Sequence, residues 1–272
     1  MNTIIEREER GVIKPSELPT WLLSHGITTV TTKECAHLFG CDINDVPAKL
    51  VYLRKNNQIV AIARGLWVVV PVENMNMGAP EPIRYIDSLM NFYESEYCLG
   101  WLTAASSYGV SHQAPQVFQI VTNKKIRDKK IGRSELKFYE RTYVKQISKK
   151  KFVVSNGIAN TPTAGGTMLM LCADLLLSGG IDNVATIIGE LVESCDDYID
   201  EILVDAHLFQ TSVVRRLGWI LENIVNEKRL DDLKNICDDG TNPSLLSPYN
   251  SHSGPIDLNW HLIINRKIEV DI

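Results

Sequence analysis

Residues 45–70, which read DVPAKLVYLRKNNQIVAIARGLWVVV, constrain the fold more than any other stretch of this chain. Asn44 or Asp45 can cap a helix here, and Asn56-Asn57 ends it. Two runs rich in β-branched residues follow, QIVAIA and LWVVVP, with Arg64-Gly65 as the turn between them. The pattern predicts one helix with one β-hairpin directly after it.

Two shorter helices are predicted before this unit. SELPTWLLSHG, residues 16–26, is typical of a helix that ends at Gly26. TTKECAHLFG, residues 31–40, is typical of a second helix with Thr32 as its N-cap and Gly40 as its end. The predicted N-terminal order is therefore three helices and then a hairpin.

The helix predicted over residues 45–55 has one apolar face. Val46, Leu50 and Leu53 recur at the i, i+4 and i+7 spacing of a buried helical stripe. Helix, helix–turn–helix and hairpin is the order of a winged helix-turn-helix, whose third helix can enter a DNA major groove. The residues predicted to contact DNA are Lys33, Lys49, Tyr52, Arg54, Lys55 and Arg64.

These predicted contacts divide between bases and phosphates. Lys49 and Tyr52 are expected near base edges, Arg64 leads the hairpin, and the other three are expected near phosphates. Residues 1–80 carry eight Lys/Arg and eight Asp/Glu, so the surplus of cations that phosphate contacts normally need is absent. A winged helix also serves as a protein-interaction module, and the same cations suit a solvated helix face.

The stretch VENMNMGAPEP, residues 72–82, predicts a linker from its Pro, Gly and Asn content. It separates a winged helix-turn-helix domain at 1–75 from a C-terminal domain at 81–272. In the second domain the strand patterns QVFQIVT (116–122), ELKFYER and KFVVSN come first. Helical patterns dominate from TAGGTMLMLCADLLL onward. Strands followed by helices predict a mixed α+β fold.

The net charge of −5 is unevenly distributed along the chain. Residues 81–151 carry thirteen Lys/Arg against seven Asp/Glu, whereas residues 152–272 carry seven against eighteen. The runs KKIRDKKIGR (124–133) and KQISKKK (145–151) predict one electropositive patch that extends a DNA footprint or attracts RNA. The alternative is a solvated loop and a strand edge guarded by lysine. The patch comprises Lys124, Lys125, Arg127, Lys129, Lys130, Arg133, Lys149, Lys150 and Lys151.

The cysteines and apolar runs exclude several classes of protein. None of the six cysteines forms a C-x-x-C pair, so no metal and no cofactor are predicted, and a reducing cytoplasm is expected. The N-terminus MNTIIEREERGVI lacks the apolar core of a signal peptide. MLMLCADLLL, residues 168–177, is too short to span a bilayer, so no membrane partner is predicted.

Three motifs that invite a catalytic interpretation favour structural roles. Ser106, Ser107 and His112 lack a G-x-S-x-G elbow, so helix termination and buried hydrogen bonds are predicted there. TPTAGGTM lacks the phosphate-loop frame and its Lys, so a loop entering a helix with Thr167 near the N-cap is predicted. The acidic run CDDYIDE, residues 195–201, predicts a solvated helix start.

Asp174 places a carboxylate inside an apolar run. An unpaired buried charge is costly, so a structural ion pair is predicted, with Arg215 or Arg216 as the partner.

Several motifs, taken in order, resemble one family. They are RGLWVV, YCLGWLTAASSYGVSHQAPQVFQIVT with its His112-Gln113, GGTMLMLCADLL, VATIIGELVE, VVRRLGWILE and the tail GPIDLNWHLIINRKIEVD. No single motif is diagnostic, but their order and spacing over nearly the whole chain resemble the AbiEi antitoxin family. That family belongs to bacterial type IV toxin–antitoxin systems, which act in abortive infection as a phage defence.

The resemblance implies an N-terminal winged helix that represses its own operon and a C-terminal domain that neutralises a co-encoded nucleotidyltransferase-like toxin. The expected partners are operator DNA with an inverted repeat and that toxin, with direct toxin contact left open. No enzymatic activity is expected. Two alternatives remain: a winged helix that binds a partner toxin directly, and an enzyme with an appended winged helix, which would need a cleft of convergent titratable groups.

Overall fold

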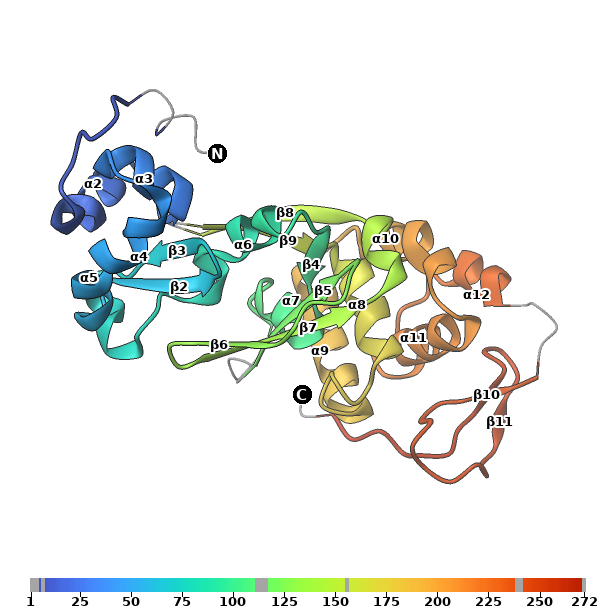
Figure 1. Ribbon diagram of the computed structural model, residues 1–272. Helices are drawn as coiled ribbons and strands as arrows, with labels where there is room; N and C mark the ends of the chain where they lie inside the picture. Colours follow the sequence, from blue (N-terminus) through green and yellow to red (C-terminus); the bar gives the residue numbers. More distant parts are fainter. Residues whose placement is uncertain (1–4, 6–7, 111–116, 155–156, 238–241, 271–272) are drawn as a thin grey trace.

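The computed structural model describes residues 5, 8–110, 117–154, 157–237 and 242–270, and it shows an N-terminal unit beside a larger second unit (Figure 1). The predicted three helices and hairpin of the N-terminal unit are confirmed. Its helices are η1 (Pro15–Glu17), α2 (Leu18–Ser24), α3 (Thr32–Phe39), η2 (Ile43–Asp45), α4 (Val46–Lys49) and α5 (Val51–Lys55), where η marks a 3-10 helix. Its strands are β1 (Thr29–Thr31), β2 (Ile59–Ala63) and β3 (Leu66–Val69).

Glycines with positive φ end the first two helices and turn the hairpin, as predicted. Gly26 has φ of 67° directly after α2, and Gly40 has φ of 63° at the C-cap of α3. Gly65 has φ of 94° between β2 and β3. This left-handed region strains residues that carry a Cβ, so glycine is the residue that suits these three turns.

The helix caps agree with the prediction only in part. Thr31, not Thr32, caps α3: its Oγ1 accepts a hydrogen bond from the backbone N of Glu34 at 3.2 Å. The carboxylate of Glu34 accepts one from the backbone N of Thr31 at 2.7 Å, which completes a capping box. At the third helix Asp45 is the N-cap residue of α4, as one of the two expected candidates, but it makes no side-chain cap hydrogen bond, and Asp42 caps the preceding η2.

The helix predicted over residues 45–55 forms as two short segments. Leu50, with ψ of −5°, separates α4 from α5, yet its backbone N still donates to Val46 O at 3.0 Å. The predicted stripe of Val46, Leu50 and Leu53 is at most 1% exposed, so it is confirmed. This stripe packs into a core with α2, α3 and one face of the hairpin.

The three strands of the N-terminal unit form an antiparallel sheet in the order β1-β3-β2. Helix, strand, two helices and a two-stranded hairpin, with the first strand added beside the last, fits a winged helix.

The second unit begins with a mixed region of short helices and strands. Its helices are η3 (Val72–Met77), η4 (Pro82–Arg84), α6 (Ile86–Phe92), α7 (Trp101–Ser106) and η5 (Thr142–Lys145). Its strands are β4 (Tyr97–Leu99), β5 (Val117–Thr122), β6 (Lys129–Ile131), β7 (Ser134–Glu140), β8 (Lys149–Val154) and β9 (Gly157–Pro162). The strands predicted at QVFQIVT, ELKFYER and KFVVSN correspond to β5, β7 and β8, although the last two residues of KFVVSN lie outside the described residues.

The strands of this region form a four-stranded sheet in the order β4-β5-β7-β6 and a separate β8-β9 ribbon. β5 and β7 are parallel, and the other pairs are antiparallel.

The remaining helices are α8 (Ala164–Ala173), α9 (Ile181–Ser194), α10 (Tyr198–Asp205), η6 (Ala206–Leu208), α11 (Thr211–Asn223) and α12 (Asp231–Cys237). The short strands β10 (Ser244–Leu245), β11 (Ile256–Asp257) and β12 (Leu262–Ile263) close the chain. The α+β fold is confirmed.

The hairpin β2-β3 packs on the second unit as well as on its own helices. Its second face enters a buried cluster with α6, β5 and β7. The hairpin residues in that cluster are Ile62, Ala63, Leu66 and Val68, and those of α6 and its flank are Tyr85, Ile86, Leu89 and Met90. A continuous core therefore joins the two units, in addition to the predicted linker at 72–82.

Candidate nucleic-acid interface

Trp67 anchors the surface where the third helix meets the hairpin. Its indole nitrogen donates to Thr32 Oγ1 at 3.0 Å, which ties β3 to the first turn of α3. The guanidinium of Arg54, on α5, lies over the Trp67 ring at 5.6 Å from its centre. This cation–π contact directs Arg54 across the hairpin, because the ring face attracts the cation.

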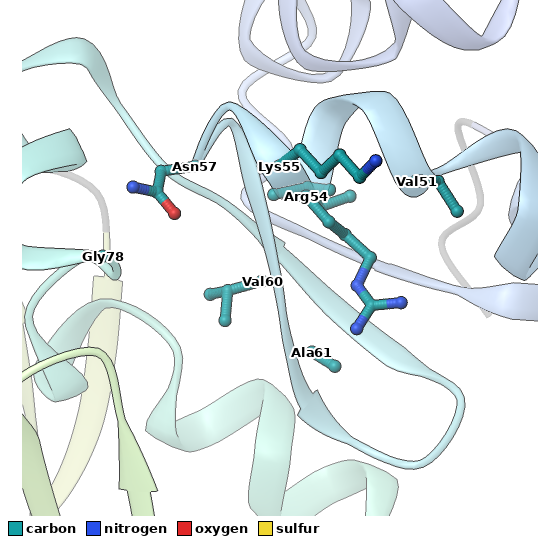
Figure 2. A pocket seen from close by; sticks show the side chains of 8 residues that line it. Val51, Arg54, Lys55, Asn57, Val60, Ala61 and Gly78 are labelled. Atoms are coloured by element: carbon teal, nitrogen blue, oxygen red, sulfur yellow. The ribbon is translucent and has the colours of Figure 1, made fainter.

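Two shallow hollows flank this contact. The first, of about 500 Å³, lies between α5, β2 and Gly78, and Figure 2 shows Arg54 reaching from α5 across the hairpin toward Ala61. The second, of about 530 Å³, lies between the start of α4 and the hairpin turn, where it is lined by Asn44, Pro47 and Arg64 among others. Ala61 lines both hollows, so they form one concave surface between the third helix and the hairpin.

All six residues predicted to contact DNA are exposed. Arg54 and Lys55 line the first hollow and Arg64 lines the second, so the structure brings these three together. Lys33 lies next to Thr32, whose backbone N donates to Gly65 O at 2.9 Å. Lys33 and Arg64 therefore stand on adjoining segments.

Lys49 and Tyr52 differ from the other four in position. Neither side chain lines the two hollows, although Tyr52 is 67% exposed. Asp42 and Asp45 are exposed at the start of the third helix, where they add negative charge beside the second hollow. The cations are thus concentrated at the end of α5 and at the hairpin turn.

The first predicted basic run surrounds a third hollow, of about 370 Å³, which Tyr93 also lines. Lys129 lies over the Tyr93 ring at 5.5 Å, and Lys124 Nζ donates to the backbone oxygens of Tyr93 and Glu94 at the end of α6. Four other cations of this run are exposed and make no ion pair with another described residue. They are Lys125, Arg127, Lys130 and Arg133.

This first run adjoins the segment that links the two units. The backbone N of Arg133 donates to Met77 O at 3.1 Å, and a Cβ on Gly132 would come within 2.4 Å of that same oxygen. Figure 1 shows the β6-β7 hairpin extending toward β2. Because Gly78 lines the first hollow, the cations of β6 continue the basic rim formed by α5.

The second predicted basic run is engaged within the molecule. Lys149 pairs with Glu96 at 3.4 Å and donates to Val144 O at 2.7 Å. Lys151 pairs with Asp87 at 3.6 Å. Lys150 lies over the ring of Tyr108 at 4.3 Å. These lysines are held in structural contacts, in contrast to the free cations of residues 125–133.

The partner predicted for Asp174 was wrong. Asp174 Oδ1 accepts from Arg141 Nη2 at 3.0 Å, not from Arg215 or Arg216. Arg216 instead donates to the backbone oxygens of Cys172, Leu245 and Leu246, so its buried side chain joins α8 to the segment at β10.

The glycine motif TPTAGGTM leads from the end of β9 into α8. Thr163 caps α8 by accepting from Gly166 N at 3.1 Å, so the predicted cap at Thr167 was wrong. Thr167 is fully buried one turn later. Gly165 N donates to Glu201 Oε2 at 2.9 Å, and a Cβ at Gly165 would lie 2.5 Å from Ile202 N. The glycine pair therefore allows α8 and α10 to pack closely.

The remaining motifs and two buried cysteines have structural roles. The hydroxyls of Ser106 and Ser107 donate to Thr103 O and Ala104 O at the end of α7, as predicted, whereas His112 lies outside the described residues. The acidic run leads into α10, also as predicted. Burial raises the pKa of the thiols of Cys98 and Cys172 to about 12, so both remain protonated.

Among the described residues, no cluster of three or more His, Cys, Asp or Glu side chains is arranged to hold a metal ion. In the same part of the chain, no helix has the length and apolar character needed to cross a membrane.

The second unit has the features of an antitoxin domain. Residues 98–223 match the family model of the AbiEi antitoxin C-terminal domain. Residues 98–223 are therefore similar to the C-terminal domain of AbiEi antitoxins, and this match supports a role in a toxin–antitoxin system.

A solved structure shares the fold of both units. The RV2827C protein from Mycobacterium tuberculosis matches with a TM-score of 0.67 and 13% sequence identity, over 94% of this chain and 92% of that protein. At this identity the likeness concerns the fold alone. No curated protein sequence matches the chain.

Proposed function

We propose that this antitoxin represses its own operon by binding an inverted-repeat operator through residues 1–75. The observation that carries the proposal is the concave surface between the third helix and the hairpin, rimmed by Arg54, Lys55 and Arg64. Exposed cations at the end of the reading helix and at the hairpin turn suit the phosphate strands that border a major groove. Lys33 adds a cation beside the hairpin turn, and Lys49 and Tyr52 extend the surface along the helix.

The cations of β6 enlarge the same surface. Lys130 and Arg133 lie on the strand and turn that contact Met77 and Gly78, beside the first hollow. The shared core holds the hairpin against the second unit, so this arm has a fixed position relative to the reading helix. Its cations add sequence-independent attraction to phosphate, because Lys and Arg contacts to phosphate carry no base information.

Residues 81–272 neutralise the toxin in this proposal. The matched antitoxin domain, at residues 98–223, lies wholly within this region and supports the assignment. The toxin is a co-encoded nucleotidyltransferase-like protein, as the family resemblance implies, and the antitoxin itself is not an enzyme. The six free cysteines suit the cytoplasm, where operator and toxin are both present.

The test measures binding of the full-length protein to its own promoter fragment by gel shift at several salt concentrations. Binding should exceed that to random DNA and weaken steeply with salt. Arg64→Ala should reduce affinity for both DNAs and make the salt dependence shallower, because one phosphate contact is lost. Lys151→Ala is the matched control, since Lys151 is already paired with Asp87. Equal binding to promoter and random DNA at every salt concentration would reject the repressor function.

Growth in the presence of the toxin tests the second half of the proposal. The full-length Arg54→Ala/Arg64→Ala variant should lose repression but still protect cells that express the toxin from an unrelated promoter. Loss of protection in that variant would favour the alternative, a winged helix that contacts the toxin directly. Ile43, Val51 and Tyr52 are exposed apolar side chains on the third helix, which is the observation that keeps this alternative open.

A further inference from the structure

The outward face of the third helix is largely apolar. Helical periodicity places the strip opposite the buried stripe at Ala48, Val51, Tyr52 and Lys55. All four residues are exposed, with Val51 at 40% and Tyr52 at 67%. The side chains that project farthest from the helix are therefore a methyl group, an isopropyl group, a phenol ring and one ammonium group.

The polar side chains that commonly read bases are engaged elsewhere. Arg54 lies over the Trp67 ring, and Asn44 donates from both its backbone N and its Nδ2 to Asp42 Oδ1 at 2.8 and 2.9 Å. A bidentate Asn–adenine pair needs the Nδ2 group that Asn44 directs at Asp42, and the contact with Trp67 directs the guanidinium of Arg54 across the hairpin and away from the outward strip. In this arrangement the third helix presents few hydrogen-bonding groups to a base edge.

Only one group on the major-groove edge of the four DNA bases is apolar, the C5-methyl of thymine. We propose that Val51 and Tyr52, with Ala48, read thymine methyl groups, so that this helix selects its site by apolar contact. The inference rests on the proposed operator binding and specifies which chemical group of the DNA the helix recognises.

The charges beside the strip favour DNA over a protein partner for this face. Lys55 lies within the strip, and Arg54 and Arg64 border the adjoining hollows. None of these three cations pairs with a carboxylate among the described residues, so they remain available to phosphates. An apolar strip flanked by free cations matches a thymine-bearing groove between two phosphate strands.

The decisive experiment uses two promoter fragments of identical sequence, one made with thymidine and one with deoxyuridine in its place. Deoxyuridine pairs like thymidine but lacks the C5-methyl group. Wild-type protein should bind the deoxyuridine fragment more weakly, by roughly fourfold for each methyl group buried against the helix. The measurement is a gel-shift titration of full-length protein on both fragments, with random DNA alongside.

Variants separate methyl contact from a general change in DNA shape. Val51→Ala and Tyr52→Ala should bind the thymidine fragment more weakly and discriminate less between the two fragments. Both positions are exposed, so the fold should persist, and a thermal melt checks this. Arg64→Ala should bind both fragments more weakly while the ratio of affinities stays as in the wild type.

The possible failures are distinguishable. Promoter-specific binding that is equally tight on both fragments would overturn the methyl readout and leave the operator proposal intact. A fragment ratio that is unchanged in the Val51→Ala/Tyr52→Ala double variant would also overturn it, because the discrimination would then arise elsewhere. Absence of promoter-specific binding would overturn both proposals together.

Discussion

The arginines of the two units have opposite surroundings. Arg54 and Arg64 of the N-terminal unit are exposed, and they border hollows at the molecular surface. Arg215 and Arg216 of α11 are at most 4% exposed, and they donate to backbone oxygens of the chain that follows α11, including those of Cys237 and Leu246. The same guanidinium group thus offers donors to a ligand in one unit and fastens the chain's own backbone in the other.

The difference shows why net charge is a poor guide to function in this chain. The second unit is acidic beyond residue 151. Two of its few cations there, Arg215 and Arg216, are buried and are therefore not available to a ligand at the surface. The N-terminal unit has no net surplus of cations, yet its exposed cations gather on one surface. The position of a charge, more than its count, decides whether it is available to nucleic acid.

The largest effect on stability is expected for a buried arginine. Arg216→Ala should lower the free energy of unfolding by about 3–5 kcal/mol, because two buried carbonyl oxygens and one partly buried carbonyl oxygen lose their donor and a cavity remains. Urea denaturation measures it. Arg64→Ala, as the exposed counterpart, should stay within about 0.5 kcal/mol of the wild type. A loss of under 1 kcal/mol in Arg216→Ala would mean that these hydrogen bonds contribute little to stability.

The second prediction concerns the core that joins the two units. Leu66 is 3% exposed in the cluster shared with α6, so Leu66→Ala should cost about 2–4 kcal/mol. Tryptophan fluorescence and far-UV circular dichroism should report a single coincident transition in wild type and variant. Leu23→Ala, at a side chain 43% exposed, is the control. Two separated transitions in the wild type would show that the units unfold independently.

Local signals in the sequence were sufficient for the N-terminal unit. Gly26, Gly40 and Gly65 mark turns that need positive φ, and the spacing of Val46, Leu50 and Leu53 marks the buried stripe. The T-x-x-E pattern that begins at Thr31 indicates the true cap of α3, whereas the predicted cap was the neighbouring Thr32. The two hydroxyls belong to adjacent residues, and only the capping-box hydrogen bonds with Glu34 distinguish the true cap from its neighbour.

Sequence patterns did not predict the contacts between segments that are distant in the chain. The sequence did not predict that Arg141 would pair with Asp174, since β7 and α8 meet only in the folded chain. β9, which reads GIANTP, lacks the alternation of a typical strand and is held by its pairing with β8. The proximity of β6 to the linker depends on Gly132, whose close approach to Met77 follows from the tertiary fold.

A third prediction concerns pH in the acidic, helical region. Hydrogen bonds from Arg229, together with those from Tyr198 and the backbone N of Lys228, hold the pKa of Glu227 well below its usual range. The folded state therefore binds this proton less tightly than the unfolded state. Stability is present above the unfolded pKa of about 4.3 and is lost as pH falls through the folded pKa.

Glu227→Gln tests this contribution directly. The variant should be less stable than the wild type at pH 7, and the difference should shrink below about pH 4, where Glu227 begins to gain its proton in the unfolded chain but not yet in the folded one. Thermal melts between pH 3 and pH 7 measure it. Glu193→Gln, at an exposed position near the end of α9, is the control. If the stability difference between variant and wild type were constant from pH 3 to pH 7, lost packing would explain it and ionisation of Glu227 would not.

The smallest effects are expected within the predicted basic patch, where two of its cations can be compared. Arg133 has no ion pair with a described residue and adjoins the linker, whereas Lys151 pairs with Asp87 at 3.6 Å. If only free cations attract phosphate, Arg133→Ala should reduce the slope of log affinity against log salt by about 0.9, and Lys151→Ala should leave it unchanged. Both variants should stay within about 1 kcal/mol of wild-type stability, as is usual for exposed charges. Equal slopes for the two variants would show that pairing within the molecule does not decide which cations of the patch meet DNA.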